Sequence, residues 1–169
     1  LKIKMKVFIT GAQGQVGKEL VSLAEQCGFD TFAAGRSELD ITMIKNIESS
    51  IQLQKPDIVI NAAAYTAVDK AEEYQDIAYA INRDGAENLA AVCEEQNIPL
   101  LHISTDYVFD GTKSEAYSES DDVSPLGIYG MSKWQGEEAI RRKLPQHIIL
   151  RVAWVFGAHG DNFVKTMLR

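Results

Sequence analysis

Three glycines in G-x-x-G-x-x-G spacing, at positions 11, 14 and 17, constrain the fold more than any other feature. They follow a short apolar, β-branched run, Lys6–Thr10, and they open a segment, 15–27, with apolar residues on one helical face. Glycine permits a tight turn and a close backbone approach, and a helix N-terminus that follows such a turn attracts anions. A strand, a glycine turn and a helix in this order predict a βα unit that binds the pyrophosphate of a dinucleotide.

The same alternation of strand and helix continues along the chain. Strands are expected at 31–34, 57–64, 100–104 and 147–152, and helices at 44–54, 69–96 and 129–143, with a bend or break near 84–85. Residues 115–125 are expected to form a loop, and residues 162–169 the beginning of a helix. Helical crossovers of this length favour parallel pairing. The predicted fold class is α/β, a doubly wound parallel sheet of Rossmann type.

Composition narrows the function classes. The chain has 169 residues, and 46% of them are hydrophobic, so we interpret 1–169 as one NAD(P)-binding Rossmann domain. The net charge of -7 argues against nucleic acid as the main partner. No apolar run approaches the length of a membrane span and no signal peptide is apparent, which predicts a cytoplasmic protein. We expect Cys27 and Cys93 to be buried small hydrophobes and predict no metal site.

Ligands in doubly wound sheets bind beyond the carboxyl ends of the strands. Segments 11–17, 35–41, 62–68, 104–109 and 153–157 are therefore predicted to converge. From this convergence we expect dinucleotide contacts from Gly11, Gln13, Ala62, Ala63 and Ser104.

Arg36 bears on the choice of dinucleotide. An acidic residue after the second strand would bind a ribose 2′-hydroxyl, whereas an arginine accommodates a 2′-phosphate. This chain has Arg36 and Ser37 there, which favours NADPH and leaves NADH as the alternative. Asp40, on the next turn, has two interpretations: it accepts a hydrogen bond from the adenine amino group, or it caps the following helix.

Tyr129 and Lys133 form a Y-x-x-x-K pair, and residues four apart share one face of a helix. A tyrosine has an ordinary pKa near 10, and a nearby ammonium group lowers it. Lys133 can also bind the nicotinamide ribose. The polar strand end Ser104-Thr105-Asp106 offers a hydroxyl to orient a carbonyl oxygen. Together with the glycine turn, these residues predict hydride transfer to a ketone, with Tyr129 as the proton donor.

The chain resembles the N-terminal part of the extended short-chain dehydrogenase/reductases, and among them the dTDP-4-dehydrorhamnose reductase family. The matching segments are 11–17 (GAQGQVG), 56–72 (PDIVINAAAYTAVDKAE), 104–111 (STDYVFDG), 125–137 (PLGIYGMSKWQGE), 151–157 (RVAWVFG) and 162–169 (NFVKTMLR).

This resemblance implies roles for particular residues. Thr105, Tyr129 and Lys133 would be catalytic. The dinucleotide would contact Gly14, Gln15, Val16, Asp40, Ile41, Ala64, Tyr65 and Thr66. The sugar nucleotide would contact Thr105, Asp106 and Trp154, with Val68 and Tyr107 nearby.

The resemblance also implies what the chain does and what it lacks. The expected reaction is the NADPH-dependent reduction of dTDP-4-dehydro-L-rhamnose to dTDP-L-rhamnose, a precursor of cell-surface polysaccharide. A substrate domain is expected downstream of residue 169. The resemblance leaves a homodimer open, and Glu19 matches a position that some relatives use near a magnesium ion at their dimer interface. A solvated helix glutamate is the simpler interpretation of Glu19.

Three other functions share parts of this pattern. A nucleotide-sugar dehydratase would carry an Asp-Glu pair after the strand-end threonine, but Tyr107 follows Asp106 here, which favours reduction. A nucleotide-sugar epimerase of the same superfamily stays open. So does a non-catalytic, NADP-binding regulatory subunit that resembles the β subunit of methionine adenosyltransferase.

Overall fold

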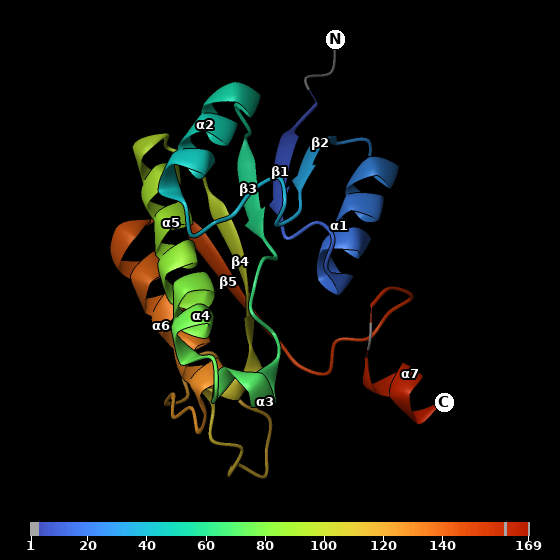
Figure 1. Cartoon of the computed structure of the whole chain (residues 1–169), viewed down its shortest axis with the longest axis vertical. Coiled ribbons are helices and arrows are strands. Elements are labelled where there is room, and N and C mark those ends of the chain that lie inside the picture. Colours follow the sequence, from blue (N-terminus) through green and yellow to red (C-terminus); the bar gives the residue numbers. More distant parts are fainter. Residues whose placement is uncertain (1–3, 161, 169) are drawn as a thin grey trace.

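The computed structural model describes residues 4–160 and 162–168. Its centre is a five-stranded parallel sheet with the order β2-β1-β3-β4-β5 (Figure 1). The strands are β1 (Lys6–Thr10), β2 (Asp30–Ala34), β3 (Ile58–Asn61), β4 (Leu100–Thr105) and β5 (His147–Val152). The chain builds outward from β1 in one direction and then from β3 in the other. This confirms the prediction of a doubly wound α/β sheet, whose reversal point lies between β1 and β3.

Helices cover both faces of the sheet. One face carries α1 (Gln15–Gln26), and the other carries α2 (Ile44–Gln54), α5 (Gly85–Glu95) and α6 (Ile128–Lys143) (Figure 1). The shorter elements are α3 (Val68–Ala71), α4 (Gln75–Tyr79), the π-helical turn η1 (Ala80–Asp84), the 3-10 turn η2 (Asp106–Val108) and α7 (Phe163–Met167). None of the helices in 4–160 and 162–168 is both long and apolar enough to cross a membrane.

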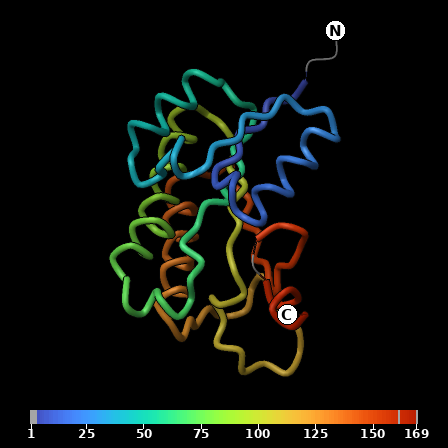
Figure 2. The backbone as a smooth tube through the Cα atoms, turned by 45° about the vertical axis from the view of Figure 1, so that its right-hand side comes forward, coloured from blue at the N-terminus to red at the C-terminus, as the bar shows by residue number. Residues whose placement is uncertain are grey.

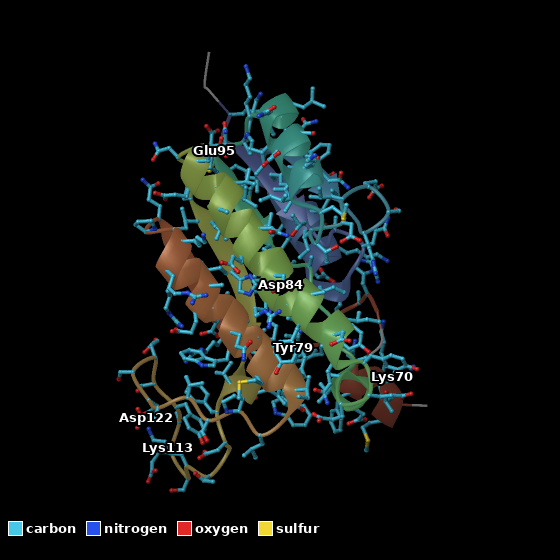
Figure 3. The ribbon with its side chains drawn as sticks, turned by 60° about the vertical axis from the view of Figure 1, so that its left-hand side comes forward. Lys70, Tyr79, Asp84, Glu95, Lys113 and Asp122 are labelled. Carbon is cyan, nitrogen blue, oxygen red and sulfur yellow. The ribbon has the colours of Figure 1, made fainter. Side chains whose placement is uncertain are left out.

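Two long connections, one after η2 and one after β5, lie near the carboxyl ends of the strands (Figure 1). The segment between η2 and α6, which carries Lys113 and Asp122, lies at the amino-terminal end of α6 (Figure 3). After β5 the chain crosses to the side of the sheet where α1 lies (Figure 2). There Gly160 approaches Gln15 so closely that a Cβ added to the glycine would be 3.2 Å from the Cβ of Gln15.

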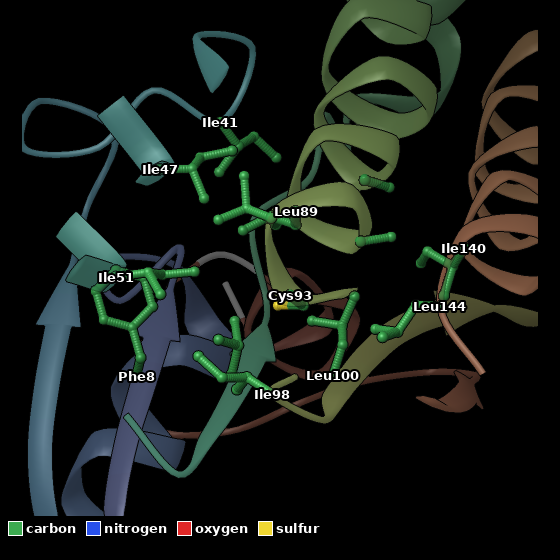
Figure 4. Close-up of a cluster of buried hydrophobic side chains, with 14 of the residues drawn as sticks. Phe8, Ile41, Ile47, Ile51, Leu89, Cys93, Ile98, Leu100, Ile140 and Leu144 are labelled. Carbon is green, nitrogen blue, oxygen red and sulfur yellow. The ribbon is translucent and has the colours of Figure 1, made fainter. Parts of the chain in front are cut away.

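The core follows from the alternation of side chains along the strands. On β1, Phe8 points into a large cluster with Ile47, Leu89 and Ile140 from α2, α5 and α6 (Figure 4). Val7 and Ile9 point to the other face and pack with Ala24 of α1. A strand buried on both faces requires a nearly continuous apolar sequence, and β1 has one.

Cys93 lies in the large cluster, as expected, but the prediction that Cys27 is buried was wrong. Cys27 is exposed. It is the C-cap residue of α1, beyond Ala24, the last residue by which that helix is buried.

Two element boundaries also differ from the predictions. The predicted strand 57–64 ends at Asn61, and beyond it the Ala63 amide donates to the Asn61 side chain rather than to a neighbouring strand. The predicted helical region 69–96 is interrupted at 72–74 and contains the π turn η1 ahead of the predicted break. Asn82 lies in this turn, and its side-chain amide binds the backbone of Tyr65, outside the helix. Such side-chain pairings are not visible in apolar periodicity.

Gly11 and Gly28 offer a matched test of the glycine turn. Both have positive φ, +67° and +75°. A Cβ at Gly11 would lie 2.5 Å from the Ala63 nitrogen, whereas a Cβ at Gly28 would meet nothing within 4 Å. We expect Gly28→Ala to lower the free energy of unfolding by about 1–2 kcal/mol, the cost of the left-handed conformation. Gly11→Ala adds an overpacking cost of about 1–3 kcal/mol, so it should lower the free energy of unfolding clearly more than Gly28→Ala does. Urea denaturation measures both, and equal losses would show that the close approach at Gly11 is not tight.

Candidate active site

Two adjoining cavities lie beyond the carboxyl ends of the strands, at the reversal point between β1 and β3. The larger has a volume of about 600 Å³ and the smaller about 320 Å³. All five segments predicted to converge contribute lining residues. The two cavities share Gly14, Ala62, Ala64 and Thr66, so one ligand can extend through both.

Every residue predicted for the site lines one of these cavities. The smaller cavity holds Gly11, Gln13, Arg36, Asp40, Ile41, Ala63 and Tyr65 in addition to the shared residues. The larger holds Gln15, Val16, Val68, Ser104, Thr105, Asp106, Tyr107, Tyr129, Lys133 and Trp154.

The glycine turn fits a pyrophosphate. Gly14 is the N-cap of α1 and supplies no side chain, so the first amide groups of the helix stay available to a ligand. Gly17 lies against the turn, since a Cβ there would be 2.1 Å from the Gly11 carbonyl oxygen. The Nε2 atom of Gln15 is buried and has no hydrogen-bond partner in the part of the chain that the structure describes. Free donors at a helix N-terminus are what a phosphate group requires.

Arg36 and Asp40 lie at the smaller cavity. Arg36 is exposed and forms no ion pair within the described residues. Asp40 accepts hydrogen bonds from the Thr42 hydroxyl (2.8 Å) and amide (3.0 Å), and these bonds lower its pKa, with a smaller contribution from the Arg36 charge. The helix-capping interpretation of Asp40 was wrong, because the N-cap of α2 is Met43.

The larger cavity brings together the residues that the sequence predicts for proton transfer. Tyr129 and Lys133 come from the first two turns of α6, and Thr105 from the end of β4. A Cβ at Gly130 would lie 2.2 Å from the Tyr107 carbonyl oxygen, so only glycine lets α6 start this close to η2. The Tyr107 ring meets the Tyr129 ring edge-on, with 5.6 Å between centroids.

The Thr105 hydroxyl is engaged in its own turn. It donates to the Asp106 carboxylate over 3.1 Å and accepts from the Tyr107 amide over 3.2 Å. A carbonyl oxygen of a substrate would therefore compete with Asp106 for the Thr105 proton.

The pKa of Tyr129 is raised above its ordinary value. Burial is the main cause, the Thr105 hydroxyl opposes it, and the Asp106 carboxylate adds to it. We expected Lys133 to lower this pKa. The side chain of Lys133 is instead buried and occupied elsewhere: Nζ donates to the Ile103 carbonyl oxygen (2.6 Å) and lies 3.2 Å from His102 Nε2.

Ser104 lines the larger cavity, but its hydroxyl points to the interior. It donates to Glu137 over 2.5 Å. Glu137 is fully buried and also binds Arg151 and Arg141, over 2.7 and 2.9 Å. This ion cluster ties α6 to the ends of β4 and β5, and it places Ser104 as a structural partner of Glu137. Contact of Ser104 with a dinucleotide stays a prediction.

Trp154 and Glu19 are both exposed to solvent. Trp154 has a φ of +51°, is 74% exposed and packs edge-on against Phe163. Glu19 lies beside Gly157. No group of three His, Cys, Asp or Glu residues within the described ranges is arranged to hold a metal ion.

Sequence reasoning missed several buried polar residues behind the cavities, among them Asn61, His102 and Glu137. Two of them carried a usable signal. Asn61 ends the apolar run of β3, and His102 interrupts that of β4, and polar side chains in strands buried on both faces require hydrogen-bond partners.

Comparisons with known proteins agree with this geometry. A family model described as the RmlD substrate binding domain matches residues 5–169. A dTDP-4-dehydrorhamnose reductase of Aggregatibacter actinomycetemcomitans is 48% identical over 97% of this chain, which covers 56% of that protein.

Solved structures give the same result. The crystal structure of a dTDP-4-dehydrorhamnose reductase from Bacillus anthracis in complex with NADP is 42% identical, with a TM-score of 0.95 over 98% of this chain and 59% of that one. A Thermus thermophilus UDP-glucose 4-epimerase, 20% identical with a TM-score of 0.85 over 93% of this chain and 58% of that one, shares the fold. The chain thus spans little more than half the length of these relatives, and it belongs to the RmlD substrate-binding-domain family.

Proposed function

We propose that this chain carries the dinucleotide site and the proton donor of an NADPH-dependent reductase, whose substrate is the nucleotide-linked keto sugar dTDP-4-dehydro-L-rhamnose. The main support for this proposal is that the two cavities are continuous with each other. One is lined by the glycine turn and Arg36, the other by Tyr129, Lys133 and Thr105, and four shared residues join them. Two similarities support the proposal: the relative at 48% identity is a dTDP-4-dehydrorhamnose reductase, and the solved relative at 42% identity is in complex with NADP.

NADPH, when bound, supplies the hydride that reduces the carbonyl carbon. The residues of this chain supply the proton and the orientation. The Tyr129 hydroxyl donates its proton to the carbonyl oxygen, which becomes the new sugar hydroxyl, and the Thr105 hydroxyl orients that oxygen. Burial raises the pKa of Tyr129, so the phenol is protonated at neutral pH but is a weaker acid, and proton donation requires stabilisation of the phenolate. The phenolate left behind needs a nearby cation, and Lys133, in the same cavity, is the candidate.

The dinucleotide would lie along the shared residues. The amide groups at the start of α1 would bind the pyrophosphate, and Arg36 the 2′-phosphate of NADPH. Asp40, Ile41 and Tyr65 would surround the adenosine. The sugar nucleotide would enter beside Val68, Tyr107 and Trp154, and we propose that the rest of its site lies outside this chain. The cytoplasmic location and the homodimer stay predictions.

Substitution of the proton donor tests the mechanism in the full-length protein. Tyr129→Phe removes only the acidic hydroxyl, so we expect turnover with dTDP-4-dehydro-L-rhamnose to fall by about 10²- to 10⁴-fold while NADPH affinity stays unchanged. Stopped-flow loss of NADPH absorbance and a fluorescence titration measure the two. Tyr74→Phe, at an exposed tyrosine outside both cavities, is the matched control. Normal turnover in Tyr129→Phe would refute Tyr129 as the acid. A wild-type protein that binds NADPH without turnover would indicate the regulatory-subunit alternative.

Arg36 should set the preference for NADPH over NADH. Loss of a charge-assisted contact worth about 1.5–3 kcal/mol weakens NADPH binding by about 10- to 100-fold in Arg36→Ala and leaves NADH binding almost unchanged. Titration of both dinucleotides measures the ratio. Arg142→Ala, at an exposed arginine of α6, controls for the loss of one positive charge. An unaltered preference in Arg36→Ala would assign the selectivity to other residues.

A further inference from the structure

A chain of buried polar groups links the glycine turn to Lys133 across three strands. Thr10 Oγ1 donates to Asn61 Oδ1 over 2.7 Å, Asn61 Nδ2 lies 2.9 Å from His102 Nδ1, and His102 Nε2 lies 3.2 Å from Lys133 Nζ. All four residues are buried, where an unpaired polar group is costly. The proposed mechanism uses Lys133 but assigns no role to Asn61 or His102.

The orientation of Asn61 is determined by its neighbours. Its Oδ1 atom lies 3.0 Å from the backbone nitrogen of Ala63, which can only donate a hydrogen bond. The atom that faces Ala63 is therefore the amide oxygen, and the atom that faces His102 is the NH₂ group. An NH₂ group also only donates, so His102 Nδ1 has to accept and carries no proton.

The protonation of His102 follows. Complete burial lowers the pKa of this imidazole well below its ordinary value, so the ring is neutral, and Lys133 lowers that pKa further only when the lysine is charged. A neutral imidazole without a proton on Nδ1 has its proton on Nε2. Nε2 then faces Lys133 as a donor.

An ammonium group has no lone pair and can only donate. A charged Lys133 would therefore place its N–H groups against the Nε2–H group at 3.2 Å, with no acceptor between them. An uncharged amine has one lone pair, which accepts from Nε2–H. It keeps two N–H groups, one of which donates to the Ile103 carbonyl oxygen over 2.6 Å. The contacts of Lys133 are thus complete only for the uncharged amine.

We propose that Asn61 fixes the proton of His102 on Nε2, so that His102 binds Lys133 only as an uncharged amine and turns the protonated lysine toward the larger cavity. His102 is then a positioning residue for Lys133. The consequence for the cofactor rests on the proposed function: the dinucleotide binds the protonated, outward lysine, so its binding is accompanied by uptake of a proton.

The surroundings of Lys133 set the pH at which this change occurs. Burial lowers its pKa to about 8, against the opposing effect of Glu137 one turn further along α6. Glu137 is itself bound to Arg151 of β5 and to Arg141. From η2, Asp106 and Tyr107 line the same cavity, as does Tyr129. Below pH 8 the lysine is mostly charged and directed outward, and above pH 8 it is mostly held by His102.

Nuclear magnetic resonance of the cofactor-free, full-length protein tests the proposal without any turnover. In ¹⁵N-histidine-labelled protein, the His102 signals, assigned by their loss in His102→Gln, should show a protonated Nε2 and a bare Nδ1. Lysine labelled with ¹³C at Cε should give a Lys133 titration near pH 8. A proton on Nδ1, or a Lys133 titration at the ordinary value near 10.5, would overturn the inference.

Asn61→Asp provides a second, opposite test. An aspartate accepts from the imidazole, so the proton should move to Nδ1. The bare Nε2 then accepts from an ammonium, and the pKa of Lys133 should rise above 10. The added charge alone raises that pKa, so the position of the ring proton is the diagnostic result. Asn46→Asp, at an exposed residue of α2, adds the same charge and should leave His102 unchanged. A proton that stays on Nε2 in Asn61→Asp contradicts the assignment.

Calorimetry of NADPH binding in buffers of different ionisation enthalpy measures the proton uptake. At pH 8.5, a lysine with a pKa of about 8 is about three-quarters uncharged, so binding should take up about three-quarters of a proton, and NADPH affinity should fall as the pH rises above 8. Lys133→Met should abolish this uptake, whereas Lys143→Met, at an exposed lysine of α6, should preserve it. Binding without proton uptake would contradict the coupling. Failure to bind NADPH at all would contradict the proposed function, while the ring proton and the Lys133 titration decide the inference.

Discussion

The structure depends on one close approach, the contact between the turn after β1 and the chain that leaves β3. The Gly11 position has no room for a side chain, because the backbone of Ala62 and Ala63 lies where a Cβ would be. This contact brings the two central strand ends together at the reversal point of the sheet. Residues of the glycine turn and of Ala62–Thr66 then line both cavities. At Gly11 and Gly14 a ligand would meet backbone without a side chain, which suits the diphosphate of a dinucleotide.

Behind this edge, the polar groups of the interior are distributed in two separate systems. Glu137 with Arg151, Arg141 and Ser104 forms a charged cluster whose partners are all satisfied, and it ties α6 to the sheet. Asn61 and His102 form an uncharged system that ends on Lys133. Buried ion pairs are costly to break, whereas a single amine between a carbonyl and an imidazole can change its proton count. The first system therefore fixes the helix, and the second leaves one of its side chains adjustable.

The extent to which the sequence predicts this structure varies with the kind of interaction. Apolar periodicity placed β1 and α2 to the residue, because burial on a face is a local pattern. The strand-end rule brought all the predicted site residues to two adjoining cavities. Periodicity failed at η1 and at the end of β3, where side-chain amides bind backbone groups: Asn82 binds Tyr65, 17 residues away, and Asn61 binds Ala63. The direction of the Lys133 amine was equally hidden, since it depends on His102, 31 residues earlier, and on the rotamer of one long side chain.

Asn82 in the π turn connects the two cavities mechanically, because it holds the Tyr65 backbone against α6. Its amide is bonded to both backbone groups of Tyr65 and to the hydroxyl of Ser132, which in turn donates to the Tyr129 carbonyl oxygen. Gly136 lies against the Asn82 carbonyl oxygen, so α6 cannot slide away from the turn without losing contact. Tyr65, at the smaller cavity, and Tyr129, at the larger one, thus share one support. The fold, rather than a ligand, thus sets the distance between the two cavities. A substrate would be accommodated by movement of the outer wall, where Trp154 is exposed.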